Sequence, residues 1–91
     1  NANITLAQCL TDKGVKMYGA DWCSACQKQK SLFGLAFKKV NYIECDKRIL
    51  ECQQANIRAF PTWIFPDGKR MEGVLPLEQL ASLGGCSIDK R

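Results

Sequence analysis

Two cysteines separated by two residues, Cys23 and Cys26, carry the clearest chemistry in this sequence of 91 residues. They precede a helix-like segment, and this spacing in the first turn of a helix brings two sulfurs within bonding distance. Free N–H groups at the start of the helix favour a thiolate at Cys23, which lowers its pKa and makes it the attacking sulfur. Cys26, one turn further on, is suited to resolving a mixed disulfide. The pair therefore predicts thiol–disulfide exchange.

A second motif, Phe60-Pro61-Thr62-Trp63, places a proline between an aromatic residue and a threonine at the start of an apolar run. Together the two motifs favour thiol–disulfide chemistry. A two-cysteine motif alone is also typical of a structural disulfide or of half a zinc site. Both alternatives remain open from the motif alone.

Six cysteines and no histidine narrow the chemistry further. Cytosolic proteins rarely carry so many cysteines unless they bind metal, and an even number permits three disulfides. Without histidine, a metal site would need cysteine or carboxylate ligands, so we expect no metal and no other cofactor. A chain of this length is near the lower limit for a self-sufficient hydrophobic core, and covalent support is therefore expected.

The formal net charge of +4 comes from lysines and arginines that are spread along the chain without a block. This pattern indicates a solvated surface and disfavours nucleic-acid binding. No apolar run approaches the roughly 18 residues that a membrane span requires. The chain begins at Asn1 without a methionine, which is compatible with removal of a leader or of a larger upstream part.

The apolar periodicity predicts a strand before the cysteine pair and a helix after it. A strand at residues 15–19 follows a short amphipathic helix at residues 3–13, which is capped by Asn3. The helix after the motif is predicted at residues 23–37, with Gly34 in its interior packed closely against another element. Its buried face consists of Cys26, Leu32, Phe33, Ala36 and Phe37.

The middle of the chain predicts a half-buried strand at residues 40–44 and then a helix running to about residue 55. Asp46 is expected to cap this helix, and Ile49 and Cys52 are expected to face inward. A proline-glycine turn then predicts a β-hairpin over residues 61–73.

A last helix is predicted before Gly84-Gly85, which end it. We expect residues 1–91 to form a single domain, with the first helix within residues 1–14 and a loose tail at residues 87–91. The apolar stripe of the last helix consists of Leu77, Leu80, Ala81 and Leu83.

The order of elements, the Trp-Cys-x-x-Cys entry to a helix and the later Pro-Thr before a strand resemble the thioredoxin superfamily. A longer set of motifs within residues 13–85 resembles the thioredoxin-like domain fused to bacterial and plant vitamin K epoxide reductase homologues. The resemblance implies an α/β, thioredoxin-like fold: a central mixed four-stranded sheet flanked by helices, with an extra N-terminal helix. The motifs are Met17-Tyr18-Gly19-Ala20, Trp22-Cys23, Cys26-Gln27, Gln29-Lys30, Leu32-Phe33-Gly34, Tyr42-Ile43-Glu44-Cys45, Cys52, Pro61-Thr62-Trp63 and Gly73-Val74.

In that family the thioredoxin-like domain passes electrons from substrate cysteines to a quinone-reducing membrane domain. The resemblance therefore implies a thiol–disulfide oxidoreductase that supports disulfide formation in exported proteins. Its partners would be cysteine-containing polypeptides and a quinone-linked membrane protein, on the exported or lumenal side of a membrane such as the periplasm or thylakoid lumen. We expect a monomer that binds no nucleic acid.

The resemblance also assigns roles at the site. Cys23 and Cys26 take the redox role, and Pro61 matches the substrate-side proline, which is cis in the family. Its neighbour Phe60 would offer backbone groups to an extended peptide, with Thr62 beside it, and Trp22 would border the sulfur as an apolar contact surface. The alternatives are a trans proline at a strand edge and a tryptophan without contact to substrate.

The family domain carries a second, non-catalytic cysteine pair, which the resemblance places at Cys45 and Cys52. Cys9 and Cys86 then remain, and a disulfide between them would tie the two ends of the chain together. Two free thiols are the alternative.

Two departures from the family pattern bear on mechanism. Ser24 and Ala25 stand between the active cysteines, where related oxidising domains tend to have proline and histidine, so we expect a less extreme oxidant. Ser24 either fills the start of the helix or donates to the neighbouring thiolate. Thioredoxins place an acidic proton acceptor beneath the pair, whereas this position is Met17 here, which leaves Asp21, Glu44 or water as acceptors.

Two further functions compete with the oxidase. A reductase or isomerase of the same fold would use the same residues and differ in reduction potential and partner. A disulfide-stapled or zinc-stapled interaction domain would have no turnover. Zinc would require Cys23, Cys26, Cys45 and Cys52 to converge, whereas the predicted fold places the second pair away from the first.

Overall fold

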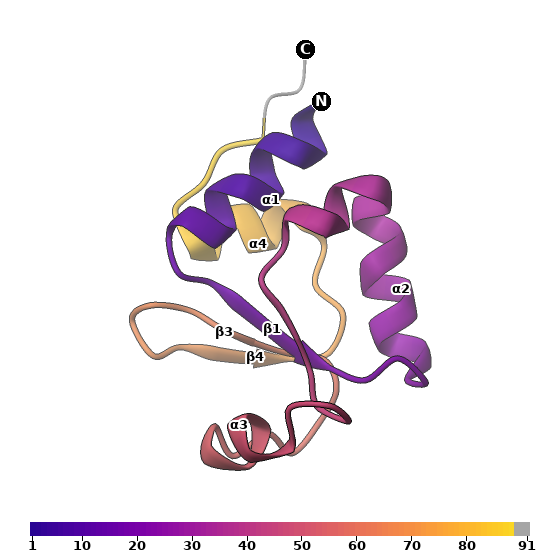
Figure 1. Cartoon of the computed structure of the whole chain (residues 1–91). Helices are drawn as coiled ribbons and strands as arrows, with labels where there is room; N and C mark the ends of the chain where they lie inside the picture. Colours follow the sequence, from indigo (N-terminus) through magenta and orange to yellow (C-terminus); the bar gives the residue numbers. More distant parts are fainter. Residues whose placement is uncertain (89–91) are drawn as a thin grey trace.

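A mixed four-stranded sheet lies at the centre of the computed structural model, which describes residues 1–88 (Figure 1). The strands run in the order β2-β1-β3-β4. β1 is parallel to β2 and antiparallel to β3, and β3 is antiparallel to β4. The strands are β1 (Lys16–Gly19), β2 (Tyr42–Glu44), β3 (Thr62–Ile64) and β4 (Arg70–Glu72). β1 is one residue and β2 two residues shorter than predicted, and β3 and β4 lie within the predicted hairpin.

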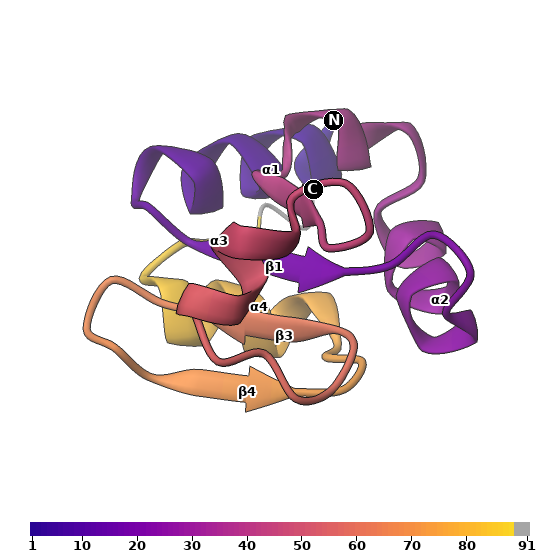
Figure 2. The ribbon, with the colours of Figure 1, turned by 60° about the horizontal axis from the view of Figure 1, so that its bottom comes forward.

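The helices cover both faces of this sheet. They are α1 (Ala2–Asp12), α2 (Ser24–Phe33), the 3₁₀ helix η1 (Gly34–Lys39), α3 (Ile49–Gln54) and α4 (Leu77–Gly84). α1, α2 and α4 lie on one side, and α3 lies alone on the other, as Figure 1 shows. Figure 2 is turned to bring α3 in front of the sheet. A sheet flanked by helices, with a helix before its first strand, is the predicted architecture.

Each face of the sheet has its own hydrophobic core, because side chains alternate between the faces along a strand. On the α1, α2 and α4 side, Met17 of β1 and Trp63 of β3 are fully buried. On the α3 side, Tyr18 and Ile43 pack with Cys45 and Cys52. The cysteine motif follows β1 directly, so the sheet holds the start of α2 in place.

Gln29 is a fully buried polar residue of α2 that joins three parts of the fold. Its Oε1 accepts hydrogen bonds from the backbone N–H of Leu75 (2.8 Å) and from Trp63 Nε1 (3.1 Å). Its Nε2 donates to the carbonyl oxygen of Leu75 (3.0 Å). Burial of the amide is tolerated because each of these polar groups has a partner.

Two disulfides staple the fold. Cys9 of α1 bonds to Cys86, just after α4, with the two Cα atoms 6.1 Å apart. Cys45, at the end of β2, bonds to Cys52 of α3. These are the pairings that the sequence analysis expects. Of the loose tail predicted at 87–91, residues 89–91 lie outside the described residues.

Two predictions about the N-terminal half were wrong in detail. The first helix begins at Ala2 instead of residue 3, because the Asn1 side chain caps it by accepting from the N–H of Asn3 (2.8 Å). The helix after the motif ends at Phe33 instead of residue 37, because Gly34 takes a positive φ of 63° and the chain continues as 3₁₀. No atom lies within 4 Å of a Cβ built on Gly34, so it breaks the helix and does not mediate close packing.

Three predicted side-chain positions also differ. Leu32 is exposed, and Gln29 takes the buried position on that helix instead. Asp46 does not cap α3, which begins three residues later, because its carboxylate binds Trp22 and its N–H donates to Glu44. Ile49, in the first turn of α3, faces outward with 55% of its surface exposed.

Candidate active site

Cys23 occupies the N-cap position of α2, where an extended backbone turns into helix. Its carbonyl oxygen accepts the first helical hydrogen bond from the N–H of Gln27 (3.0 Å). The pKa of the Cys23 thiol is lowered, chiefly by a hydrogen bond from the backbone N–H of Cys26, with help from the Cys26 thiol and the backbone of Ala25. The side chain of Cys23 is partly exposed. An accessible sulfur that favours the thiolate is suited to attack a disulfide.

Cys26 has the opposite character. It is a free thiol with no exposed surface, and burial raises its pKa from 9.0 to about 11. The hydrogen bond and charge of Cys23 also raise it, whereas the backbone of Ala20 and the charge of Lys30 lower it. At neutral pH this sulfur is a thiol that meets only the neighbouring Cys23 and the protein interior. It is therefore suited to the resolving role.

The loop before β3 closes over the nucleophile. The Phe60–Pro61 peptide bond is cis, and the Phe60 carbonyl oxygen lies 3.7 Å from Cys23 Sγ, which donates to it. The Pro61 carbonyl oxygen is held by the N–H of Gly73 (2.8 Å). Thr62 is buried, and its hydroxyl donates to the carbonyl oxygen of Ala59 (2.7 Å). The Thr62 side chain therefore braces the loop from inside the fold.

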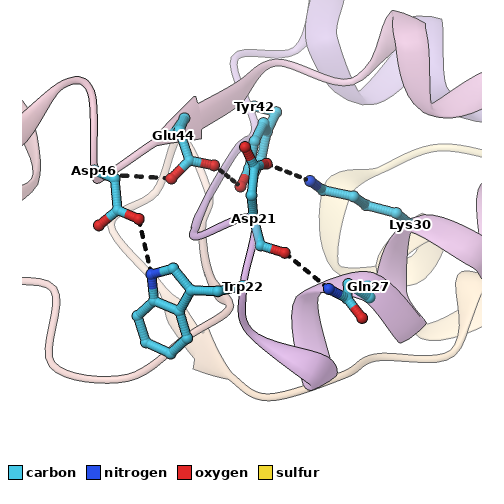
Figure 3. Close-up of polar contacts among 7 residues, drawn as sticks. All are labelled: Asp21, Trp22, Gln27, Lys30, Tyr42, Glu44 and Asp46. Atoms are coloured by element: carbon cyan, nitrogen blue, oxygen red, sulfur yellow. Dashed lines mark hydrogen bonds and ion pairs between the residues drawn. The ribbon is translucent and has the colours of Figure 1, made fainter.

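Trp22, the residue before Cys23, forms an exposed aromatic surface next to the Phe60 ring. With 68% of its surface exposed, it meets the Phe60 ring edge-on at a centroid distance of 5.8 Å. Its indole Nε1 donates to Asp46 Oδ2 (2.7 Å), which fixes the ring (Figure 3). The two rings thus lie against each other, and the Phe60 carbonyl contacts the partly exposed Cys23 sulfur.

Figure 3 shows a group of polar side chains around Tyr42. Tyr42 lies near the buried Cys26 sulfur, because both would contact a Cβ built on Gly19. Tyr42 Oη donates to Glu44 Oε1 (2.8 Å), and Lys30 Nζ pairs with Asp21 Oδ1 (3.2 Å) while lying 4.3 Å from the centre of the Tyr42 ring. A hydrogen bond with the Glu44 side chain, followed by that with Lys30, lowers the pKa of Asp21. Burial and the bond to Glu44 raise the pKa of Tyr42.

Sequence reasoning named Asp21 and Glu44 but missed Tyr42 and Lys30. Two signals were present in the sequence: Lys30 stands four residues after Cys26 on one helix face, and Tyr42 shares a strand face with Glu44. Met17, at the position that is acidic in thioredoxins, is fully buried and has no group that accepts a proton at neutral pH.

The remaining predicted residues lie elsewhere. Ser24 is the exposed first residue of α2, and no side-chain hydrogen bond caps this helix. Cys45 and Cys52 are bonded to each other on the α3 side of the sheet, so their sulfurs are not available to complete a zinc site with the active pair.

Known proteins that are similar to this chain include one oxidoreductase and two solved structures. The chain is 44% identical to thiol-disulfide oxidoreductase LTO1 of Arabidopsis thaliana over 96% of its own length, and it spans about a quarter (25%) of that protein. Its fold is similar to that of a solved malarial protein, with a TM-score of 0.62 and 22% identity over 76% of this chain and 89% of the other. Oxidised mitochondrial thioredoxin 3 from Saccharomyces cerevisiae gives a TM-score of 0.56 with 20% identity over 76% of this chain and 74% of the other.

At these identities the two structures bear on the fold alone, and the similarity to thioredoxin 3 confirms that the fold is thioredoxin-like. No family model matches the chain. Within residues 1–88, none of the helices has the length and apolarity needed to cross a membrane.

Proposed function

We propose that the chain is a protein thiol–disulfide oxidoreductase of the thioredoxin superfamily. The similarity to the Arabidopsis protein, a vitamin K epoxide reductase homologue with a thioredoxin-like domain, agrees with the resemblance drawn from the motifs. The observation that carries the proposal is the contrast between the two sulfurs. Cys23 is partly exposed with a lowered pKa, whereas Cys26 is buried with a raised pKa.

This contrast orders the reaction. In the oxidising direction a substrate thiolate attacks Cys23 of the Cys23–Cys26 disulfide, which forms a mixed disulfide and releases Cys26. A second substrate thiolate then attacks the substrate sulfur of that bond, so that a substrate disulfide forms and Cys23 leaves as a thiolate. Two electrons move from the substrate to the active pair. The reverse sequence, with Cys23 attacking and Cys26 resolving, reduces a substrate disulfide.

The proposed substrates are extended polypeptide segments that contain cysteine. The exposed Trp22 and the partly buried Phe60 offer a continuous apolar surface next to Cys23, and the Pro61 loop offers backbone groups. Main-chain pairing with apolar flanks accepts many sequences, which suits an enzyme acting on diverse proteins.

We further propose that residues 1–91 act as one redox domain on the oxidising side of a membrane, in the periplasm or the thylakoid lumen. The disulfides Cys9–Cys86 and Cys45–Cys52 support this compartment, because such bonds persist where the surroundings are oxidising. A quinone-linked membrane protein is the proposed acceptor of the electrons, and the domain itself is proposed to be monomeric.

The equilibrium reduction potential of the active pair in glutathione buffers tests the direction of flow, with Cys23→Ser as the control that cannot form the bond. A value nearer about −120 mV, as in periplasmic oxidants, supports disulfide formation. A value nearer about −270 mV, as in thioredoxin, would assign a reductase instead. Absence of cycling, together with no reduction of insulin, would refute the enzyme and leave a disulfide-stapled interaction domain.

A further inference from the structure

Under the proposed function, on which this inference rests, Cys26 must lose its proton before it attacks. The resolving sulfur must be a thiolate when it attacks, yet Cys26 has no exposed surface from which water can take the proton. Met17, beside it in the core, is apolar. An acceptor must therefore be reached through the protein.

Gly19, at the end of β1, leaves the space in which such a path begins. A Cβ built on Gly19 would lie 2.8 Å from Cys26 Sγ, 3.2 Å from Tyr42 Cε1 and 3.5 Å from Tyr42 Oη. The sulfur and the hydroxyl edge of the ring therefore border the same point, which is vacant only because residue 19 lacks a side chain. The charge of Cys26 also contributes to the raised pKa of Tyr42, as expected for neighbours.

From Tyr42 the path continues toward the surface. The Tyr42 hydroxyl donates to Glu44 (2.8 Å), which also accepts from the backbone N–H of Asp46 (3.2 Å). Glu44 is half-buried, so this end of the path reaches water. Asp21, which pairs with Lys30, is 70% exposed.

The positively charged groups around this path favour the loss of the proton from Cys26. From α2, Lys30 pairs with Asp21 and lies over the Tyr42 ring, and its charge lowers the pKa of Cys26. The charge of Lys47, after β2, likewise lowers the pKa of Asp21. The backbone N–H of Asp46, in the turn after β2, donates to Glu44, and the apolar ring of Phe37 in η1 packs against Tyr42.

We propose that the Tyr42 hydroxyl passes the Cys26 proton to Glu44, which releases it to water. As the Cys26 S–H bond breaks, the proton binds Tyr42 Oη, and the proton of Tyr42 Oη moves to Glu44 Oε1. Tyr42 thus remains neutral, and Glu44 is protonated. The Cys26 thiolate attacks Cys23, the Cys23–Cys26 bond forms, and the substrate sulfur leaves with the bonding electron pair. In the opposite direction the same path returns a proton to Cys26.

The test isolates the resolving step with a chromogenic aryl disulfide. Reduced protein attacks it through Cys23 and releases one coloured thiolate, and Cys26 then displaces the second in a phase whose rate does not depend on reagent concentration. An aryl thiolate needs no proton to leave, so this second phase reports the loss of the Cys26 proton. It is recorded by stopped flow between pH 6 and about pH 10, a range that approaches the pKa of about 11 for Cys26.

Tyr42→Phe keeps the ring, and Glu44→Gln keeps the shape of the side chain, while each removes one step of the path. Each is expected to slow the second phase at least tenfold at pH 7, with the difference shrinking as the pH rises. The first phase should stay unchanged, and the double variant should be no slower than either single one, because both residues serve one path. Tyr18→Phe, on the other sheet face, and Glu72→Gln, on β4, are the matched controls.

Wild-type second phases in both variants would overturn the proposal, as would slowing by one constant factor at every pH, which indicates a structural role. Slowing in Tyr42→Phe alone would also overturn it, because Glu44 would then not be the acceptor. If the wild-type protein releases the first thiolate but never the second, the proposed function fails, and this inference fails with it.

Discussion

Removing the Cys9–Cys86 disulfide is expected to destabilise the protein about twice as much as removing the Cys45–Cys52 disulfide. The two bonds differ chiefly in the loop that they close, with sequence separations of 77 and 7 residues. A cross-link restricts the unfolded chain more strongly when its loop is longer. The chain-entropy relation gives about 4.5 kcal/mol for the long loop and about 2.4 kcal/mol for the short one.

The assay is equilibrium unfolding in urea of the C9A/C86A and C45A/C52A double variants, both made with Cys23→Ser so that no sample can oxidise its active pair. For a chain of this size the free energy falls by about 1 kcal/mol per molar urea. The midpoints should therefore shift down by about 4 M and about 2 M. In both variants α1 keeps its buried contacts through Leu6, Ala7 and Leu10, so a folded baseline should remain.

The comparison of the two variants is the informative measurement, because losses common to both cancel. Equal shifts, or a larger shift for C45A/C52A, would refute the loop-entropy reasoning. The second result would indicate instead that the short bond holds α3 and its small core in place.

Three further outcomes follow from the packing around the active pair. Gly19→Ala should cost about 1 to 3 kcal/mol in urea unfolding and slow the resolving phase, because its Cβ would lie 2.8 Å from Cys26 Sγ; unchanged values would contradict the close approach. Gln29→Leu should cost about 3 kcal/mol or more by the same measurement, since buried groups of Leu75 and Trp63 lose their partner, and a near-neutral result would show that the network relaxes. The third concerns pH. Burial raises the pKa of folded Cys26 from 9.0 to about 11, so the unfolded chain releases this proton first. The free energy of unfolding of the reduced protein, compared with that of Cys26→Ala, should be constant below pH 9 and fall by up to about 3 kcal/mol by pH 11. Parallel pH profiles of the two proteins would exclude this effect of the Cys26 pKa.

The pKa of one active cysteine is set mainly by local sequence, and the pKa of the other is set by tertiary packing. The helix start alone lowers the pKa of Cys23, because the N–H groups of Ala25 and Cys26 come from adjacent residues. The raised pKa of Cys26 depends on the core that forms around it from distant segments. A peptide with the same motif would therefore retain part of the lowered pKa of Cys23 but not the raised pKa of Cys26.

Local pattern was sufficient for most of the fold. The period of apolar residues, the turn at Pro66-Asp67-Gly68 and the cysteine spacing depend on neighbours in the sequence, and they predicted the order of strands and helices. Element ends were predicted less well, because they depend on single backbone choices. Gly34 has the freedom to continue or to end a helix, and in the folded chain its positive φ ends α2.

Tertiary structure alone decided which residues share the site. Cys26 and Tyr42 are 16 positions apart in the sequence, and they meet because β1 and β2 pair in parallel, with Gly19 beside Glu44 and Met17 beside Tyr42. The same holds for Trp22 with Asp46 and for Gln29 with Leu75. The residue types of the nucleophile and its partner sulfur follow from the sequence. The surroundings that set their protonation follow from strand register, which no local pattern specifies.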